Sequence, residues 1–434
     1  MIILYNLIFF FLIIICSPFI IPLIIFSEKR RKTVLHRLGM ASFLTETSKK
    51  AVENPKKPIW VHALSVGEVL SAMPMLDSLR ENFCDHPIVL SVSTKTGFEI
   101  ANRLLKEKVD SIFFFPYDFI FSVKHICNQV DPSIVHIVES EIWPNFMYEM
   151  KKRNVPVIFV NARLSERSFS GYRRISFFIK PVLKSFAKVC TQSIEDSMRF
   201  KILGVPLDNI KLTGNIKFDQ KEINVSMEEI QETRRSMNIA YDQKIIIAGS
   251  THNGEEAVIL EAFLMLKKKF QDLLLIIVPR DPKRGRSVSM LFKSAHFTAV
   301  IMKDIKTEKP ATALDVIVVD KIGSLKRLYA LADVTFVGGS LVNSGGHNPL
   351  EPAAFSKPII FGKHMGSFAQ IPKMLVEADG AVCVQNSRGL YEAIKTLLED
   401  NAKADEMGKK AFQIFNSNKG AINKTLKVVE AYIH

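Results

Sequence analysis

One carboxylate stands where a general base would be useful. Glu68 ends the sequence SVGE (residues 65–68), which follows the apolar run Ile59–Leu64. If that run is a parallel strand, Glu68 lies near its carboxyl end, where such sheets bind ligands, and could take a proton from a hydroxyl group. The same spacing fits a capping box between Ser65 and Glu68. Both interpretations need a strand-to-helix turn, so the sequence leaves them equally open.

A second acidic group follows another apolar run. Glu139 and Glu141 come directly after Ile134–Val138. Two carboxylates at one strand end could bind a metal ion, act on an acceptor, or raise each other's pKa. If the strand continued through them, alternation would point both to the same side. A solvated strand edge is the alternative, but the position directly after a buried strand favours a functional role.

A lysine and an arginine are further candidates for a ligand site. Lys217 lies in GNIKFD (residues 214–219), which ends the predicted first domain, and Pro279-Arg280 ends the predicted strand Leu273–Val278. An arginine at such a position can meet a phosphate. Lys217 could project into a ligand site, whereas most lysines are solvated surface residues.

A glycine-rich stretch between two predicted strands indicates an anion site. It runs from residue 334 to residue 362 and contains turns at 338–340 and 344–346. Loops of backbone N–H groups that lead into a helix bind anions. Asn348 could cap that helix, Pro349 suits its first position, and Glu351 could complete the capping box. Either a nucleotide phosphate binds the loop and Glu351 binds ribose hydroxyls, or Glu351 only caps.

These residues need a fold that brings strand ends together. Apolar runs of strand length alternate with amphipathic stretches from residue 59 to 191, and again from 245 to 384. Such alternation predicts parallel sheets with helices on both faces. A polar stretch at about 219–227 separates the two series. We therefore expect two doubly wound domains that face each other across a cleft, with ligands at the strand ends.

The first 26 residues predict a membrane anchor. Ile2–Phe26 is almost wholly apolar and could cross the ~30 Å hydrocarbon core as a helix. Pro18 and Pro22 are expected to bend or end that helix early. A cleaved signal is the alternative, but the run is long for one and no small-residue cleavage site follows. The basic sequence EKRRK (residues 28–32) comes next, which predicts that the rest of the chain is cytoplasmic.

Composition narrows the classes of protein that fit. The 434 residues allow two domains plus an appendage, and the net charge of +14 suits nucleic acid, an anionic membrane surface or anionic substrates. No zinc-finger spacing or RNA-binding signature occurs, so nucleic acid is not expected. The five scattered cysteines include no C-x-x-C, which indicates free thiols in a reducing compartment. The basic loop at 161–174 could hold an anionic acceptor or be a solvated surface.

Common nucleotide motifs are missing from the sequence. No G-x-x-x-x-G-K-[ST] occurs, and no G-x-G-x-x-G follows a predicted strand. P-loop and Rossmann dinucleotide sites are therefore not expected. No D-x-D occurs either, which gives little support to a metal-bound sugar nucleotide.

Taken together, several stretches resemble the Kdo (3-deoxy-D-manno-octulosonic acid) transferases of lipopolysaccharide synthesis. They cover about residues 59–362 in the family's order: WVHALSVGEV, ESEIWPN, NARLSERSFSGY, GNIKFD, AGSTHNGEE, VPRDPKR, YALADVTFVGGSLV and GGHNPLEPAA. The resemblance implies an α/β GT-B glycosyltransferase fold with two Rossmann-like domains and an N-terminal transmembrane helix. We accordingly expect residues 1–27 to be the anchor, 28–220 the acceptor-binding domain, and 221–434 the nucleotide-sugar-binding domain.

The resemblance also implies an activity and a location. The expected enzyme is inverting and metal-independent, and it moves Kdo from CMP-Kdo to a lipid A precursor (lipid IVA) in lipopolysaccharide core synthesis. It needs no cofactor. It is expected in the bacterial inner membrane as a single-pass protein whose catalytic domains face the cytoplasm.

Residue roles follow from the matching motifs. The family's general base falls on Glu68, its second cleft acid on Glu139, with Glu141 as the second choice, and its cleft lysine on Lys217. The expected CMP contacts are Pro279, Arg280, Ile322, Gly323, Ser324, Asn348, Pro349, Leu350 and Glu351. Ser324 departs from the family pattern, which has glutamate there in many members. Arg280, Lys217 and the helix start at Asn348 are expected to stabilise the departing phosphate.

Two alternative functions fit the same fold. Another membrane-associated GT-B enzyme could use a UDP- or GDP-sugar, and a non-catalytic protein could keep a degenerate transferase body. Turnover of a UDP-sugar without turnover of CMP-Kdo would favour the first alternative. Absence of CMP binding would favour the second, against which the presence of Glu68, Arg280 and Glu351 argues.

Overall fold

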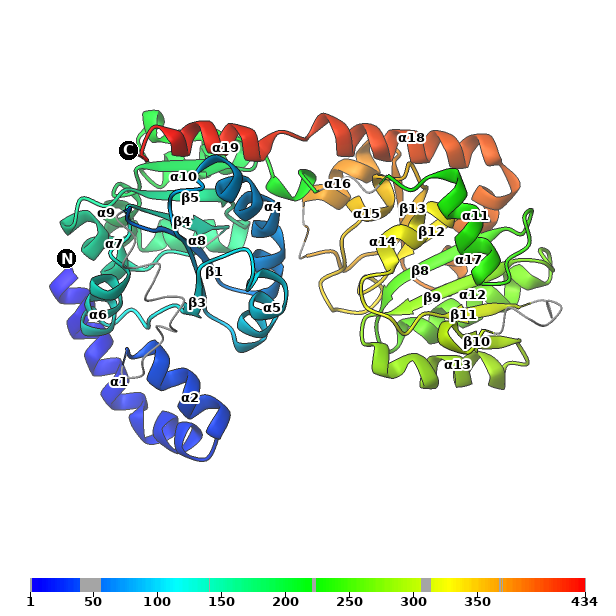
Figure 1. Ribbon diagram of the computed structural model, residues 1–434, viewed down its shortest axis with the longest axis horizontal. Helices are drawn as coiled ribbons and strands as arrows, with labels where there is room; N and C mark the ends of the chain where they lie inside the picture. The colour runs from blue at the N-terminus through cyan, green and yellow to red at the C-terminus, as the bar shows by residue number, and fades with distance from the viewer. Residues whose placement is uncertain are drawn as a thin grey trace. The chain divides into compact units, whose positions relative to one another are not determined.

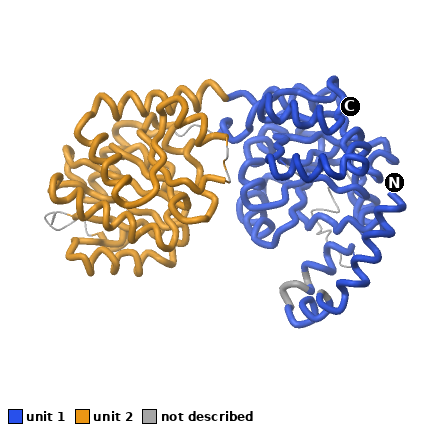
Figure 2. The backbone as a smooth tube through the Cα atoms, turned by 180° about the vertical axis from the view of Figure 1, so that it is seen from behind, with its two compact units in different colours: residues 1–220, 419–434 blue, residues 221–418 orange. Residues whose placement is uncertain are grey.

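The chain divides into two compact units, each built on one sheet. The computed structural model describes residues 2–39, 56–139, 141–220, 224–305, 314–366, 368 and 370–433. Residues 1–220 and 419–434 form unit 1, and residues 221–418 form unit 2 (Figure 2). In the described residues each sheet has seven strands. The strand pairings within each sheet are parallel.

The sheet of unit 1 has the order β3-β2-β1-β4-β5-β6-β7, and Figure 1 labels β3, β1, β4 and β5 of it. Its strands are β1 (Ile59–Ala63), β2 (Ile88–Val92), β3 (Ser111–Phe114), β4 (Ile134–Val138), β5 (Val157–Ala162), β6 (Lys188–Thr191) and β7 (Ile210–Leu212). The strand order reverses between β1 and β4. Their carboxyl ends therefore form the switch point where doubly wound sheets bind ligands.

Helices cover both faces of this sheet. One face is covered by α4 (Val66–Asn82), α5 (Lys95–Leu105) and α19 (Ala421–Glu430). The other is covered by α6 (Ile120–Val130), α7 (Pro144–Lys152), α9 (Ser176–Leu183) and α10 (Ile194–Ile202). The short elements are α8 (Glu166–Arg174), η1 (Leu207–Asn209) and η2 (Ile216–Phe218). Because both faces are covered, central strands such as β1 and β4 are buried at every position, which explains their continuous apolar runs.

Unit 2 repeats this architecture with the order β10-β11-β9-β8-β12-β13-β14. Its strands are β8 (Ile245–Thr251), β9 (Leu274–Pro279), β10 (Ala299–Ile301), β11 (Val316–Val318), β12 (Val334–Val337), β13 (Ile359–Gly362) and β14 (Ala381–Val384). Its helices include α11 (Met227–Ser236), α12 (Glu255–Lys267), α13 (Gly285–Ser294), α14 (Leu325–Leu328), α15 (Leu350–Ala353), α16 (Gln370–Glu377), α17 (Ser387–Glu399) and α18 (Asn401–Ser417). The switch point of this sheet lies between β8 and β12. The two sheets confirm the predicted fold class.

The N-terminal apolar segment forms one helix, α1 (Ile2–Ile25), followed by α2 (Glu28–Arg37). Ile2–Phe19 is long and apolar enough to cross a membrane. The expectation that the prolines end the helix early is wrong, since it continues to Ile25. Pro18 has no N–H to give to the carbonyl of Ile14, and the Ser17 hydroxyl donates to that carbonyl at 2.8 Å instead.

The first turns of α1 contact the body of unit 1 through polar side chains. The Tyr5 hydroxyl donates to Asp118 at 3.0 Å. The amides of Asn6 and Asn145 donate to each other at 2.8 and 2.9 Å. Asp118 also accepts the backbone N–H of Asn145 at 3.0 Å, at the start of α7. The start of α1 is thus held by three side-chain hydrogen bonds.

The C-terminal helix α19 belongs to unit 1, together with residues 419–434. The second domain predicted from the sequence, 221–434, included this segment. Its Ile422, Leu426 and Val429 are buried in the core beneath α4. The Asp219 carboxylate accepts the N–H groups of Gly420 at 2.6 Å and Ile422 at 2.5 Å. This contact joins residues 201 and 203 positions apart, which local patterns do not reveal. The other predicted boundary lies beside residues 221–223, outside the described residues.

Replacing Asp219 should loosen α19. Asp219→Asn removes the charge and turns an amide group toward one of the two N–H donors. Because a hydrogen bond to a charged group is worth ~1.5–3 kcal/mol, we expect the free energy of unfolding of unit 1 to fall by about that amount. Chemical denaturation followed by circular dichroism measures it, with the exposed Asp208→Asn as control. Equal stability of both variants would contradict the capping role.

Candidate functional site

Glu68 lies in the first turn of α4, directly after β1, and it is buried. Ser65 caps this helix, and its Oγ accepts the Glu68 N–H at 3.5 Å. The Glu68 carboxylate accepts the N–H of Leu64 at 2.6 Å, one residue before the position that a capping box uses. Burial, and then the charge of Glu139, raise the pKa of Glu68 to about 8. Such a carboxylate can exchange a proton near neutral pH.

Glu139 forms an ion pair with Lys217 at the same edge of the sheet. Glu139 follows β4 and has a left-handed backbone with φ of 70°. Its Oε1 lies 2.8 Å from Nζ of Lys217, and the two side chains are only 10% and 11% exposed. Lys217 lies in η2, after β7. The ion pair therefore joins two strand ends, and the lysine charge opposes the rise in the pKa of Glu68.

Glu141 contacts different side chains from Glu139. Its Oε2 lies 2.9 Å from His62 Nε2 and accepts the indole N–H of Trp143 at 3.0 Å. His62 Nδ1 is in turn 2.9 Å from the hydroxyl of Ser91. Alternation along a continuing strand would point both acids to the same side, but Glu139 and Glu141 contact different partners. The reason is that β4 ends at Val138 and Glu139 has a positive φ.

The glycine-rich turn after β12 is filled by a carboxylate of the protein itself. Glu255, the first residue of α12, accepts the backbone N–H groups of Gly339 at 2.6 Å and of Ser340 and Leu341 at 2.9 Å. It also accepts the N–H of His252 at 2.9 Å. These N–H groups are therefore occupied by a side chain, which argues against the expected phosphate site at this first turn. Glu255 lies in the motif AGSTHNGEE, and an acid in a first helical turn beside the switch point is the signal in the sequence that points to this role.

Asn348, Arg280 and Glu351 come together near the short helix α15. Asn348 Oδ1 accepts the N–H of Leu350 at 3.1 Å, so the helix begins one residue later than expected, with Pro349 at its N-cap. The Glu351 carboxylate is hydrogen-bonded to the Asn348 side chain. Burial raises the pKa of Glu351, while the charges of Lys326 and Arg280 oppose that rise. Glu351 is therefore a partly exposed carboxylate that feels the charges of two cations.

The other predicted CMP residues lie at two neighbouring strand ends. Pro279 is the last residue of β9 and pairs with Thr251 of β8. The N–H of Arg280 donates to the carbonyl of Thr251 at 3.0 Å. The segment 322–324 precedes α14, the helix that carries Lys326. Within it, Ile322 is exposed, Gly323 has a φ of 90°, and the Ser324 hydroxyl donates to the carbonyl of Lys321.

Two histidines to which the sequence pattern assigned no role lie beside this cluster. The Nε2 atoms of His252 and His347 are 2.8 Å apart, and the rings stack with centroids 5.1 Å apart. Burial, and then the charge of Arg280, lower the pKa of His347 to about 3. At neutral pH His347 is therefore uncharged, so Arg280 and Lys326 supply the positive charge near Glu351.

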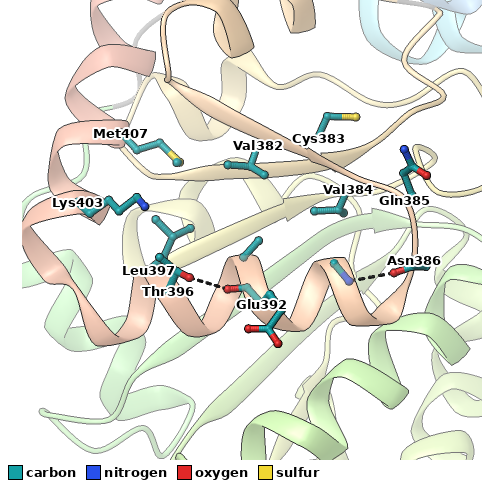
Figure 3. Close-up of a pocket in the computed structure, with 12 residues that line it drawn as sticks. Val382, Cys383, Val384, Gln385, Asn386, Glu392, Thr396, Leu397, Lys403 and Met407 are labelled. Atoms are coloured by element: carbon teal, nitrogen blue, oxygen red, sulfur yellow. Dashed lines mark hydrogen bonds between the residues drawn. The ribbon is translucent and has the colours of Figure 1, made fainter.

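A cavity of about 530 Å³ lies elsewhere in unit 2, beside the edge strand β14 (Figure 3). Its walls come from β14, α17 and α18, and they include Val382, Cys383, Glu392 and Met407. Asn386 at its rim accepts the N–H of Gly389 and so caps α17. None of the predicted site residues lines this cavity, so it is separate from the candidate site.

Comparison with known proteins gives the same family for the first unit and a broader one for the second. Residues 32–220 match the family described as 3-deoxy-D-manno-octulosonic-acid transferase (kdotransferase), and residues 229–414 match glycosyl transferases group 1. The chain is 34% identical over 429 residues to the 3-deoxy-D-manno-octulosonic acid transferase of Haemophilus influenzae, with 97% of each chain covered.

Solved structures share the fold at low identity. A glycosyltransferase from Rickettsia africae is similar with a TM-score of 0.55 and 15% identity, covering 87% of this chain and 98% of its own. The UDP-GlcNAc 2-epimerase of Neisseria meningitidis is similar with a TM-score of 0.58 and 13% identity, covering 86% of this chain and 100% of its own. At these identities the likeness establishes the fold alone.

Replacing Glu255 should lower the folding stability of unit 2 and should not change nucleotide binding directly. Glu255→Gln puts an amide group against at least one backbone N–H, and we expect unit 2 to lose ~1.5–3 kcal/mol of stability. Thermal unfolding without ligand measures this, and Glu261→Gln on the exposed face of the same helix is the control. Unchanged melting with impaired nucleotide binding would show that the turn is a ligand site after all.

Proposed function

The chain belongs to the Kdo transferase family, and from this membership we propose that it transfers Kdo from CMP-Kdo to the lipid A precursor lipid IVA. The single observation that carries the proposal is the buried Glu68 at the β1/β4 switch point, with a pKa of about 8. A glycosyl transfer to a hydroxyl needs a group that removes the hydroxyl proton. Glu68 has the location and proton affinity for this role.

We propose an inverting, metal-independent displacement. The acceptor hydroxyl oxygen forms a bond to the anomeric carbon of Kdo while its proton goes to Glu68. The bond from that carbon to the CMP phosphate oxygen breaks, and CMP leaves with the electron pair. Base catalysis of this kind typically contributes about 10²–10⁴-fold to the rate. Glu68 then returns its proton to solvent.

On the donor side, we propose that CMP binds around Arg280 and Glu351. The Arg280 guanidinium donates two hydrogen bonds to the phosphate, and the Glu351 carboxylate accepts hydrogen bonds from ribose hydroxyls. The pKa of Glu351 responds to both Arg280 and Lys326, which supports placing a charged ligand between these groups. Pro279, Ile322, Gly323, Ser324, Asn348, Pro349 and Leu350 complete the proposed CMP contacts.

On the acceptor side, we propose that Glu139 and Lys217 act on the base rather than on the leaving phosphate. The Lys217 ammonium already lies on Glu139. Their opposite effects on the pKa of Glu68 support this role. Glu139 is therefore the preferred second acid, since Glu141 is held by His62 and Trp143.

We also propose that the protein is a single-pass protein of the bacterial inner membrane with both catalytic units in the cytoplasm. The apolar length of α1 and the basic residues after it support this topology. In that arrangement Tyr5 and Asn6 leave Asp118 and Asn145. Labelling a cysteine introduced at Ile2 with a membrane-impermeant reagent tests it. Labelling from the periplasm supports the span, and labelling only after lysis contradicts it.

Product analysis tests the proposed reaction directly. The purified full chain is incubated with lipid IVA and either CMP-Kdo or a UDP- or GDP-sugar, with and without EDTA. We expect mass spectrometry to find Kdo-modified lipid with CMP-Kdo only, at the same rate in EDTA. Turnover of a UDP-sugar without turnover of CMP-Kdo would overturn the proposal.

Glu68→Gln should impair chemistry but not CMP binding. The substitution keeps the side-chain size and removes the base, so we expect kcat to fall by roughly 10²-fold or more. The wild-type single-turnover rate should rise with pH through about 8, because the base works only when deprotonated. Glu81→Gln, exposed near the end of the same helix, is the control. Near-normal single-turnover chemistry in Glu68→Gln would make Glu139 the next candidate.

Glu351→Gln should impair CMP binding. A hydrogen bond to a charged group contributes ~1.5–3 kcal/mol, which corresponds to roughly 10- to 150-fold weaker binding at 1.4 kcal/mol per decade. Calorimetric titration with CMP measures the loss, and the exposed Glu377→Gln is the control. Normal CMP affinity combined with a lower melting temperature would assign Glu351 to helix capping alone.

A further inference from the structure

Three amide side chains connect the strand ends around Lys217. Asn161 lies in β5, Gln192 follows β6, and Asn215 begins η2 after β7. All three are buried. Within the part of the chain that the structure describes, no hydrogen bond joins them to the Glu68 carboxylate. They nevertheless lie where the backbone turns toward the candidate site.

The amides form a closed circuit with the backbone of η2. Gln192 Nε2 donates to the carbonyl of Asn161 at 2.9 Å, and Gln192 Oε1 accepts from Asn215 Nδ2 at 3.0 Å. Asn215 Oδ1 accepts the N–H of Lys217 at 3.0 Å. Asn161 Oδ1 accepts the N–H of Ile216 at 3.1 Å and closes the circuit. The turn that carries Lys217 is therefore held from both sides.

This network includes a residue whose conformation costs folding free energy, which argues against an incidental arrangement. Asn161 has a φ of 53°, a conformation that costs free energy for residues other than glycine, although asparagine tolerates it best. Its Nδ2 is buried without a hydrogen-bond partner, and such a group is destabilising. A network kept only for stability would not need a strained residue with an unused donor.

We propose that Asn161, Gln192 and Asn215 are positioning residues that hold Lys217 on Glu139 and thereby fix the charge that the base Glu68 faces. This inference rests on the proposed role of Glu68. The network acts through one atom, Lys217 Nζ, which is 2.8 Å from Glu139 Oε1. It touches neither the acceptor nor the donor in this scheme.

The charges that face Glu68 determine the direction of the effect. Glu139 and Glu141, which follow β4, disfavour its ionised form, whereas Lys217 of η2 and the N–H of Leu64 favour it. His62 of β1 lies on Glu141. If Lys217 moves away from Glu139, the repulsion by the two acids remains without its nearest compensation. Glu68 then keeps its proton to higher pH.

The pH dependence of Gln192→Met tests the proposal. Methionine has a similar size but makes neither amide hydrogen bond. We expect the rising limb of the single-turnover pH–rate profile to move up by roughly 0.5–1 pH unit, so the rate below the limb falls by roughly 3- to 10-fold. Asn215→Ala should give a shift in the same direction, and it serves if Gln192→Met folds poorly.

Matched variants separate positioning from stability. Asn209→Ala also removes one amide–carbonyl bond of unit 1, from Asn209 Nδ2 to the carbonyl of Phe186, and should leave the limb in place. In a Lys217→Met background, adding Gln192→Met should move the limb no further, because the network acts through that lysine. An unmoved limb in Gln192→Met, or additive shifts in the double variant, would overturn the proposal.

A measurement without substrate keeps this test independent of the proposed reaction. The carboxyl ¹³C resonance of Glu68, assigned by its loss in Glu68→Gln, is titrated in the full-length chain. We expect the same upward shift in Gln192→Met and none in Asn209→Ala. An unchanged titration overturns the positioning role. A wild-type enzyme that fails to transfer Kdo, with the titration shifted as expected, contradicts only the proposed function.

Discussion

The first unit depends on how it compensates three carboxylates at one edge of its sheet. Like charges that are removed from water repel each other strongly, so each one needs a partner. Glu141 lies against two ring nitrogens, Glu139 pairs with Lys217, and Glu68 receives one backbone N–H from Leu64. Compensation is therefore unequal. The least compensated acid is the one whose pKa is raised to about 8, which makes it the member of the group best suited to exchange protons.

The second unit uses the same residue type for two different tasks. Glu255 accepts four backbone N–H groups and is thereby fixed as part of the scaffold between β8 and β12. Glu351 instead feels the charges of the long, cationic Lys326 and Arg280 side chains, and its pKa remains raised by burial. A carboxylate held by rigid amides has no capacity left for a ligand, whereas one held by flexible cations can exchange partners. This difference explains why Glu351, and not the glycine-rich turn, is the better nucleotide-binding candidate.

Local patterns predicted much of this molecule because its strands are buried on both faces and read as continuous apolar runs. The same patterns located Glu68 and Arg280 correctly at strand ends. They missed β7, whose three residues are partly or fully exposed, and the return of α19 to unit 1 through Asp219. They also missed the role of Glu255, since three of the four N–H groups it accepts lie more than 80 residues away. Contacts between distant segments leave no periodic trace in a sequence.

Helix α1 can make two alternative sets of contacts, with unit 1 or with lipid. Its docking on unit 1 includes three side-chain hydrogen bonds, two donated by Tyr5 and Asn6 and one accepted by Asn6, each worth roughly 0.5–1.5 kcal/mol net. More than ten of its large apolar side chains are exposed, and burying each in an apolar medium is worth about 1.5–3 kcal/mol. Lipid burial therefore outweighs docking several-fold. The proposed span follows from this inequality. In such a span Asp118 would lose the Tyr5 hydroxyl but keep the backbone N–H groups at the start of α7, so the cap of α7 does not depend on the position of α1.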